Sequence, residues 1–302
     1  MVSCHVRRNP RARRRFRMMW ISYIGKEWIR KKIGVVTFVL TLLFAGLFSF
    51  GSYEIAKHAM DEPTSHGLLN GMMLMALGLM FAQMIIAFLV LFATMGAISG
   101  EVENGLMLAV LARPIPRWKV YLGKYAGSAV WVIIYSTALY FAILLPVHHW
   151  LNFPLDAIPI LKSLLLFIWA PLLLLAVSML GSVYLPMLGN GVACALLYGL
   201  TLFSGFVENI FTIDGGGKGG NEIASQLSLF FSMLMPSNTM LRRVSYELFS
   251  GLDLPVPADM VNSLGPFSMV NVPSIAFLGY SVLYLIVLLA AGCAAFRRKD
   301  IA

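Results

Sequence analysis

The side chains that could do catalytic or metal chemistry in this sequence are few. His148 and His149 could bind a metal ion together with Asp156. Adjacent histidines next to Trp150, at the end of an apolar run, are more typical of the interface between a membrane and water. The sequence contains no HExxH and no GxSxG motif, so it predicts neither a zinc hydrolase nor a serine hydrolase of the usual kind.

A glycine run at residues 215–220 contains Lys218 and could be mistaken for a phosphate-binding loop. It lacks the GxxxxGK[ST] spacing, and no strand pattern precedes it. We therefore expect that this chain does not hydrolyse ATP by that route, and that it holds no cofactor and no metal ion of its own.

One hydrophilic segment, residues 100–124, combines charges, an apolar stretch and two prolines. Acidic side chains at its start favour the N-terminus of a helix, apolar residues follow, and the prolines end the helix. A short amphipathic helix of this kind can dock into a groove of a partner protein. The candidate contact residues are Glu101, Glu103, Gly105, Met107, Leu108, Pro114 and Arg117.

Long apolar helices are the elements that would position this segment. The 302 residues are 59% hydrophobic and 12% charged, whereas ordinary soluble domains are about 25% charged. A spanning helix needs about 20 mostly apolar residues, and continuous apolar runs favour helices over the alternating pattern of a barrel. The sequence predicts an all-α polytopic membrane protein with six transmembrane helices, at about residues 33–50, 68–98, 125–147, 163–185, 191–207 and 272–296. Residues 186–190 are the predicted tight turn between the fourth and fifth spans.

Lysines and arginines are unevenly distributed along the chain. Of the 23, eleven lie in residues 1–32, four lie between the second and third spans, and three follow the sixth. With six spans these regions share one side of the membrane, which the positive-inside rule makes cytoplasmic. We expect a multi-pass plasma-membrane protein with cytoplasmic termini that face anionic lipid headgroups. Despite a net charge of +9, we expect no nucleic-acid partner.

Two stretches precede the first span. Residues 1–19 are a basic arm, for which two interpretations stay open: a disordered lipid-binding arm, or an over-extended start with translation beginning at Met18 or Met19. Residues 20–302 are expected to form one six-span domain. At its start, aromatic and charged residues interleave as in a helix that lies in the membrane interface. The residues that mark this interfacial helix are Trp20, Lys26, Glu27 and Trp28.

The largest hydrophilic excursion is the predicted outer loop at about 208–271. It contains apolar residues at helical spacing over 223–234 and a second predicted helix from Thr239 to Phe249. We expect these helices to lie on the outer face or to dip partly into the membrane.

None of the six apolar runs contains Asp, Glu, Lys or Arg. Ion-coupled transporters and proton pumps use ionisable groups inside the membrane. If this protein moves a solute uphill, its energy must therefore come from another molecule. Gln83 is the most polar residue well inside a run; we expect it to form an interhelical hydrogen bond, with contact to a substrate as the other possibility.

Segment 100–124 resembles the loop of ABC-2 type permeases, whose pattern is Glu-x-Glu-x-Gly-Thr-Leu-Glu, a leucine-rich stretch, Pro-x-x-Arg and Gly-Lys. Leu106 and Leu108 stand where that family usually has threonine and glutamate. The helix before the first span resembles the family's elbow helix, and the tail 296–300 resembles its basic ending. The residues that match at ungapped spacing are Glu101, Glu103, Gly105, Pro114, Arg117, Gly123 and Lys124.

The resemblance implies a permease subunit of an ATP-binding cassette transporter, in which this loop is the coupling helix that seats in a cleft of a separate ATPase subunit. It also implies a permease homodimer or heterodimer, with export as the favoured direction. A non-transporting membrane scaffold or assembly factor is the alternative function, and a plain basic connector is the alternative role for the loop. An intramembrane enzyme is disfavoured because the spans lack paired carboxylates, a His/Asp pair or a metal-ligand set.

Overall fold

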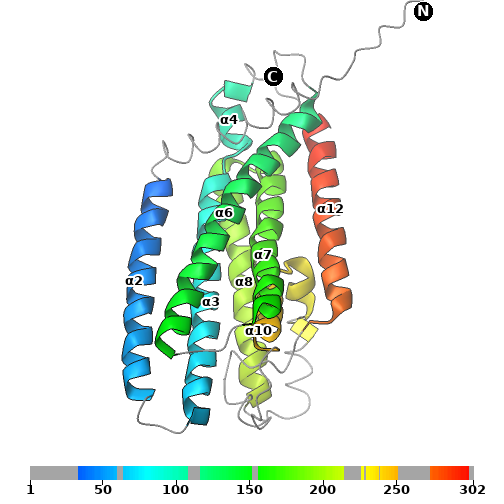
Figure 1. Cartoon of the computed structure of the whole chain (residues 1–302). Helices are drawn as coiled ribbons and strands as arrows, with labels where there is room; N and C mark the ends of the chain where they lie inside the picture. Colours follow the sequence, from blue (N-terminus) through cyan, green and yellow to red (C-terminus); the bar gives the residue numbers. More distant parts are fainter. Residues whose placement is uncertain are drawn as a thin grey trace, which may run out of the picture.

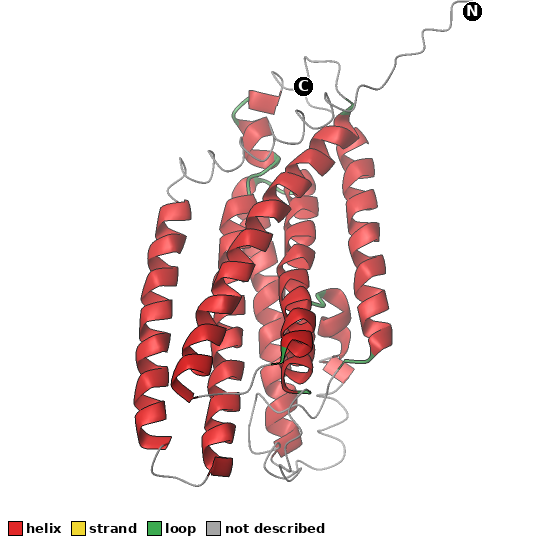
Figure 2. Ribbon diagram, viewed as in Figure 1, coloured by secondary structure: helices red, strands yellow, loops and turns green. Residues whose placement is uncertain are grey.

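The structure is a computed structural model that describes residues 33–59, 64–107, 116–151, 156–213, 226–227, 229–237, 239–250 and 273–298. Within these ranges the chain forms helices and no strand (Figure 2), which confirms the all-α prediction. Several predicted functional residues lie outside the described ranges: Trp20, Lys26, Glu27, Trp28, Leu108 and Pro114.

Six long helices run along one another, and the chain reverses direction from each to the next (Figure 1). They are α2 (Ile33–Ala59), α3 (Thr64–Thr94), α6 (Arg117–Leu151), α7 (Ala157–Tyr184), α8 (Met187–Ile213) and α12 (Ile275–Arg298). Each contains a stretch that is long and apolar enough to cross a membrane. Two short helices, α4 (Ser99–Glu103) and α10 (Thr239–Phe249), lie toward opposite ends of the bundle. These ends are called the α4 end and the α10 end below.

Most of the six helices are longer than the apolar runs that predicted them. The helix α6 begins at Arg117 instead of about 125, and α2 continues to Ala59 instead of about 50. A helix satisfies its own backbone hydrogen bonds, so it can continue through polar residues beyond the hydrocarbon core. The apolar run therefore marks the membrane-embedded part and underestimates the helix.

A tight turn separates the fourth and fifth spans as predicted, but its predicted bounds, 186–190, are wrong. Helix α7 ends at Tyr184 and α8 already begins at Met187. The amide of Asn190 donates to the carbonyl of Pro186 over 2.9 Å, closing the first turn of α8. A proline has no amide to lose at the start of a helix, so Pro186 suits this position and Asn190 becomes helical.

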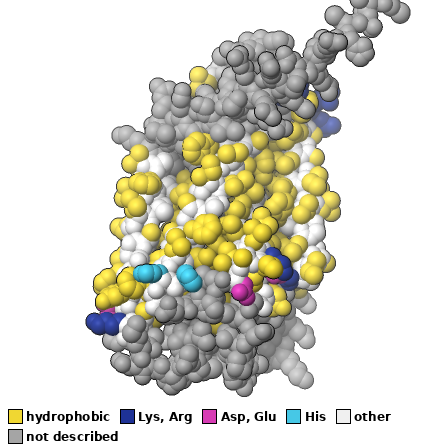
Figure 3. All heavy atoms as spheres, in the orientation of Figure 1, with side chains coloured by type: hydrophobic (Ala, Val, Ile, Leu, Met, Phe, Trp, Pro, Cys, Tyr) yellow, Lys and Arg dark blue, Asp and Glu magenta, His cyan; other side chains and the backbone are white. Residues whose placement is uncertain are grey.

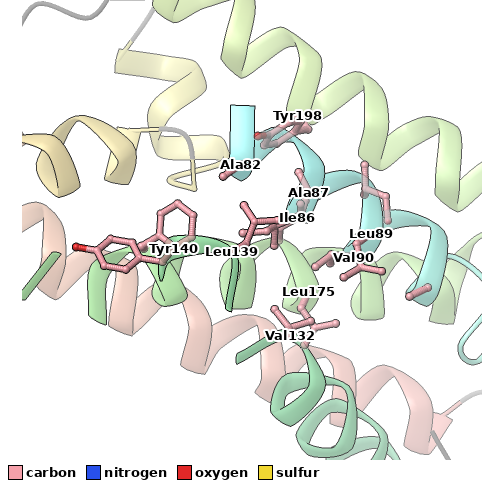
Figure 4. Packing of buried hydrophobic residues seen from close by; sticks show 14 of the residues in the cluster. Ala82, Ile86, Ala87, Leu89, Val90, Val132, Leu139, Tyr140, Leu175 and Tyr198 are labelled. Atoms are coloured by element: carbon pink, nitrogen blue, oxygen red, sulfur yellow. The ribbon is translucent and has the colours of Figure 1, made fainter. Parts of the chain in front are cut away.

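Helix α3 contains the most deeply buried of the six membrane-length stretches. Its Ile86 and Val90 are fully buried in one hydrophobic cluster with Leu139 of α6 and Leu175 of α7 (Figure 4). The small residues Ala82 and Ala87 of α3 belong to the same cluster, together with Tyr198 of α8. Small side chains let helix backbones approach closely, which is how helices associate in lipid.

The outside of the bundle is largely apolar. On the face shown in Figure 3, hydrophobic side chains cover the middle of the described surface, while the charged and histidine side chains gather near its margins. Val36 of α2 is 67% exposed and Leu188 of α8 is 76% exposed. Soluble proteins rarely expose such large apolar surfaces, so this surface fits lipid.

Polar side chains join the helices at intervals. The indole nitrogen of Trp169 on α7 donates to the hydroxyl of Ser281 on α12 over 3.0 Å. The hydroxyl of Tyr125 on α6 donates to the Leu172 carbonyl over 3.2 Å. Such interhelical bonds contribute on average about 0.6 kcal/mol each in a membrane, so they set helix orientation more than they set total stability.

At the α10 end, the predicted helix over 239–249 is confirmed as α10. Arg243 of α10 pairs with Glu247 over 2.6 Å and donates to the Pro273 carbonyl over 3.2 Å. The hydroxyl of Tyr284, the tenth residue of α12, donates to the Leu234 carbonyl over 2.6 Å. At 1.5 Å per residue this contact lies about 13 Å along α12, so the segment before α10 packs beside α12 well inside the α10 end of the bundle.

Gly292 permits the close approach of α12 and α6. A Cβ atom at this position would overlap the hydroxyl and ring of Tyr121, which is fully buried. We predict that Gly292→Ala destabilises the protein by about 1–3 kcal/mol, the usual effect of overpacking a core. Thermal unfolding in detergent checks this. The matched control is Gly279→Ala on the same helix, where a Cβ meets nothing within 4 Å; equal melting temperatures for the two variants would contradict the prediction.

Candidate functional site

The candidate site is the α4 end, where α3 breaks before α4 begins. Helix α3 stops at Thr94, and the chain turns before α4 starts at Ser99. The amide of Ala97 bonds to the Thr94 carbonyl over 3.1 Å, a tight turn that replaces one helical turn. Backbone groups at such a break lose their helical partners and need others.

A buried ion pair fixes α4 to α6. The carboxylate of Glu101 pairs with the ammonium of Lys124, and their side chains are only 8% and 5% exposed. The same ammonium donates to the Ala97 carbonyl in the break over 2.5 Å. Removing one partner of a buried pair leaves an uncompensated charge, which costs about 3–5 kcal/mol. Glu101 and Lys124 therefore hold the break against α6.

A serine of α7 caps α4 from outside. The residue at the helix start, Ile98, has no side chain that could cap it. Instead the hydroxyl of Ser182 accepts the amides of Ile98 over 2.9 Å and Ser99 over 3.1 Å. This contact satisfies free amides at a helix start, and it ties α4 to α7.

Asn190 of α8 bridges the same break. Its side chain is fully buried, and its Nδ2 donates to the Met95 carbonyl over 2.9 Å and to the Ser178 carbonyl over 3.0 Å. One amide thus holds the end of α3 and the end of α7. Nearby, the hydroxyl of Thr94 donates to that of Ser178 over 2.8 Å.

The far side of α4 forms an exposed surface. Glu103, Gly105 and Leu106 are exposed, and Leu106 is 54% exposed. Gly105 has φ +68°, a left-handed conformation that glycine adopts without strain, and it ends the helix. The Oε1 of Glu103 accepts the amide of Met187 at the start of α8 over 3.3 Å. Glu103 thus reaches the α8 start and still faces outward.

Arg117 lies at another part of this end. Its guanidinium donates to the Arg297 carbonyl at the end of α12 over 3.4 Å. Beside it, Trp118 is 49% exposed, and the Lys119 ammonium lies 5.5 Å from the centre of the Trp118 ring. Cations near a helix C-terminus interact favourably with its carbonyls. Arg117 therefore links the start of α6 to the end of α12.

The structure therefore divides the predicted contact residues into two groups. Glu101 and Met107 face into the bundle, and Met107 is fully buried. Glu103 and Gly105 are exposed, and Arg117 is partly exposed. Glu101 and Glu103 were both expected to favour the start of the following helix, but Glu103 ends α4 and contacts the start of α8 instead.

Three contacts at this end escaped the sequence analysis: the partner of Lys124, the cap by Ser182 and the bridge by Asn190. Glu101 and Lys124 each stand just outside a predicted span, and their opposite charges were a usable signal. Ser182 and Asn190 gave no comparable signal, because they bind backbone groups of Ile98, Ser99 and Met95, which only the break makes available.

Gln83 is 2% exposed, but its Oε1 has no hydrogen-bond partner within the described part of the chain. The predicted interhelical bond is therefore not seen at that atom. Among the described residues, no group of three or more His, Cys, Asp or Glu could hold a metal ion. His149 instead packs edge-on against Trp150, with ring centres 5.0 Å apart.

Six membrane-length helices packed side by side, with a polar junction at one end, define a polytopic membrane protein. The family model of the ABC-2 family transporter protein matches residues 25–301. The chain belongs to this family, whose members are membrane-spanning subunits of ABC transporters. A comparison with curated proteins found no match.

We predict that Glu101→Gln and Lys124→Met each destabilise the protein by about 3–5 kcal/mol, because each leaves one buried charge unpaired. The double variant Glu101→Leu with Lys124→Met is expected to recover most of this loss, since an apolar pair of similar volume is often neutral. Thermal unfolding in detergent checks both effects. Lys57→Met is the control because Lys57 is exposed; a double variant as unstable as the sum of the single variants would contradict the prediction.

Proposed function

We propose that this protein is the permease subunit of an ATP-binding cassette exporter, and that the exposed surface of Glu103, Gly105 and Leu106 contacts a separate ATPase subunit. The observation that carries the proposal is the backing of this surface. Directly behind it, Glu101 is paired with Lys124 of α6, and Ser182 of α7 caps α4. A surface fixed to several spans can transmit movement of a docked partner to all of them.

The charge distribution supports an external energy source. Within the six long helices, the described Lys, Arg, Asp and Glu side chains lie toward the helix ends. The pair of Glu101 and Lys124 is net neutral and buried. An ion-coupled transporter needs ionisable groups near the middle of the membrane, so ATP bound by the partner subunit is the energy source that fits these helices.

Further parts of the proposal rest on the family. By analogy, two permease subunits, identical or different, work with two ATPase subunits in the plasma membrane, and export is the direction. The lysine and arginine bias supports a cytoplasmic α4 end. The basic residues there, among them Arg297 and Arg298, suit anionic lipid headgroups.

The orientation is tested by labelling single cysteines in a variant without Cys4, Cys194 and Cys293. We predict that Leu106→Cys reacts with a membrane-impermeant maleimide only after the cells are permeabilised, because the α4 end is cytoplasmic. Ser250→Cys, exposed just after α10, is the matched control and is expected to react in intact cells. Labelling of Leu106→Cys in intact cells would contradict the proposed orientation and the docking surface with it.

The docking surface is tested by charge reversal at Glu103. We predict that Glu103→Lys lowers ATP turnover of the reconstituted complex by roughly tenfold or more, because reversing a charge at an interface disturbs its electrostatic complementarity and a loss of 1.4 kcal/mol already corresponds to tenfold. Membrane insertion is expected to stay normal. Glu103→Gln is the control, since its amide oxygen can still accept the Met187 amide. Unchanged ATP turnover in Glu103→Lys would show that this surface is not the contact, and would favour a scaffold without ATPase coupling.

A further inference from the structure

We propose that Asn190 is a positioning residue that locks the start of α8 to the break between α3 and α4, so that α4 and the start of α8 move as one body during the transport cycle. This inference rests on the proposed function, because it describes how movement at the docking surface would enter the spans. It assigns that role to one buried amide, which the sequence pattern of the loop does not contain.

The hydrogen bonds of Asn190 join three elements at one point. Its Nδ2 donates to the carbonyls of Met95, in the break, and Ser178, on α7. Its Oδ1 accepts the thiol of Cys194, one turn further along α8, over 3.4 Å. The whole side-chain amide is therefore engaged without water, since Asn190 is fully buried. Breaking the junction would leave a buried amide and two carbonyls unsatisfied, which makes separation costly.

Glycines bring the same three elements into close contact. A Cβ on Gly181 of α7 would overlap the Oδ1 of Asn190. A Cβ on Gly96 in the break would lie 2.9 Å from the sulfur of Met187, and a Cβ on Gly191 would lie 2.9 Å from the sulfur of Met95. At each of these positions the glycine backbone packs directly against a side chain of a neighbouring element, so the junction is closely packed.

The contacts of α8 show how the junction at Asn190 can pass movement from α4 to α8. Helix α8 packs mainly against α7 and α3, while one side of it is exposed along Leu188, Val192 and Leu196. At its first turn, α8 also touches the docking surface, because the Met187 amide donates to Glu103. A displacement of α4 thus reaches the start of α8 through Glu103 on the outside and through Asn190 on the inside.

A disulfide between α8 and the break tests whether the two move together. A Cβ built on Gly191 lies 3.5 Å from the Cβ of Met95, which is within the range of disulfide geometry. The variant Met95→Cys/Gly191→Cys is made with Cys4→Ala, Cys194→Ser and Cys293→Ala; serine keeps a donor toward Asn190. It is reconstituted with its ATPase, and ATP turnover is measured after oxidation and again after reduction, with each single-cysteine variant as control.

If the junction moves as one body, the oxidised variant keeps its ATP turnover within about twofold of the reduced protein. A fall of fivefold or more that dithiothreitol reverses would overturn the inference, because the elements would then have to separate. Failure of the disulfide to form under oxidant would overturn the close contact itself.

Substitution of Asn190 provides the second test of the inference. Asn190→Leu is expected to lower permease-dependent ATP turnover at least fivefold, and the oxidised disulfide in the same variant is expected to restore it, because a covalent bond replaces the lost bridge. If Asn190→Leu only destabilised the fold, a disulfide at this one contact would not restore ATP turnover. The matched control is Ser204→Ala, whose hydroxyl donates to Thr201 within α8. Equal turnover in Asn190→Leu and Ser204→Ala would also overturn the inference.

The proposed function and this inference can fail separately. If Glu103→Lys leaves ATP turnover unchanged, the docking surface is wrong whatever the disulfide does. If Glu103→Lys abolishes turnover but the oxidised disulfide also does, the docking surface stands and the rigid junction is wrong.

Discussion

The break between α3 and α4 is the constraint on which the α4 end depends. A continuous helix would satisfy its own backbone, but the turn after Thr94 leaves amides and carbonyls without helical partners. In a membrane protein such groups are expensive to leave unsatisfied. Ser182 supplies an acceptor, Asn190 and Lys124 supply donors, and each comes from a different neighbouring helix. The break therefore draws α6, α7 and α8 together.

This arrangement connects local geometry with the proposed role. The side of α4 that faces the bundle carries the buried charge of Glu101, and the opposite side carries the exposed Glu103. These two glutamates, two residues apart, therefore have different roles: Glu101 holds α4 in place, and Glu103 is accessible to a partner. A docking element gains from such a division, because force on its outer side is transmitted only if its inner side does not yield.

The site was predicted less completely than the fold. The paired glutamates, Gly105 and Arg117 were identified from spacing, but the burial of Glu101 and Met107 could not be, since both flank an exposed stretch in the sequence. Asn190 was assigned to a turn because the peptide Pro-Met-Leu-Gly-Asn is rich in turn-forming residues. Tertiary contact reversed that preference: the side chain of Asn190 donates to the Met95 carbonyl in the break and to the Ser178 carbonyl on α7, and α8 begins at Met187, three residues before Asn190.

The sequence by itself determined the six spans and the existence of α10, because continuous apolar runs and helical periodicity are local properties that lipid selects directly. It also carries membership in the ABC-2 family, whose model matches residues 25–301. Only the tertiary structure decided which polar residues meet. Lys124 lies 23 positions from its partner Glu101, and Ser182 lies 84 and 83 positions from its partners Ile98 and Ser99. Such pairings depend on how the helices pack around the break rather than on any repeat within one helix.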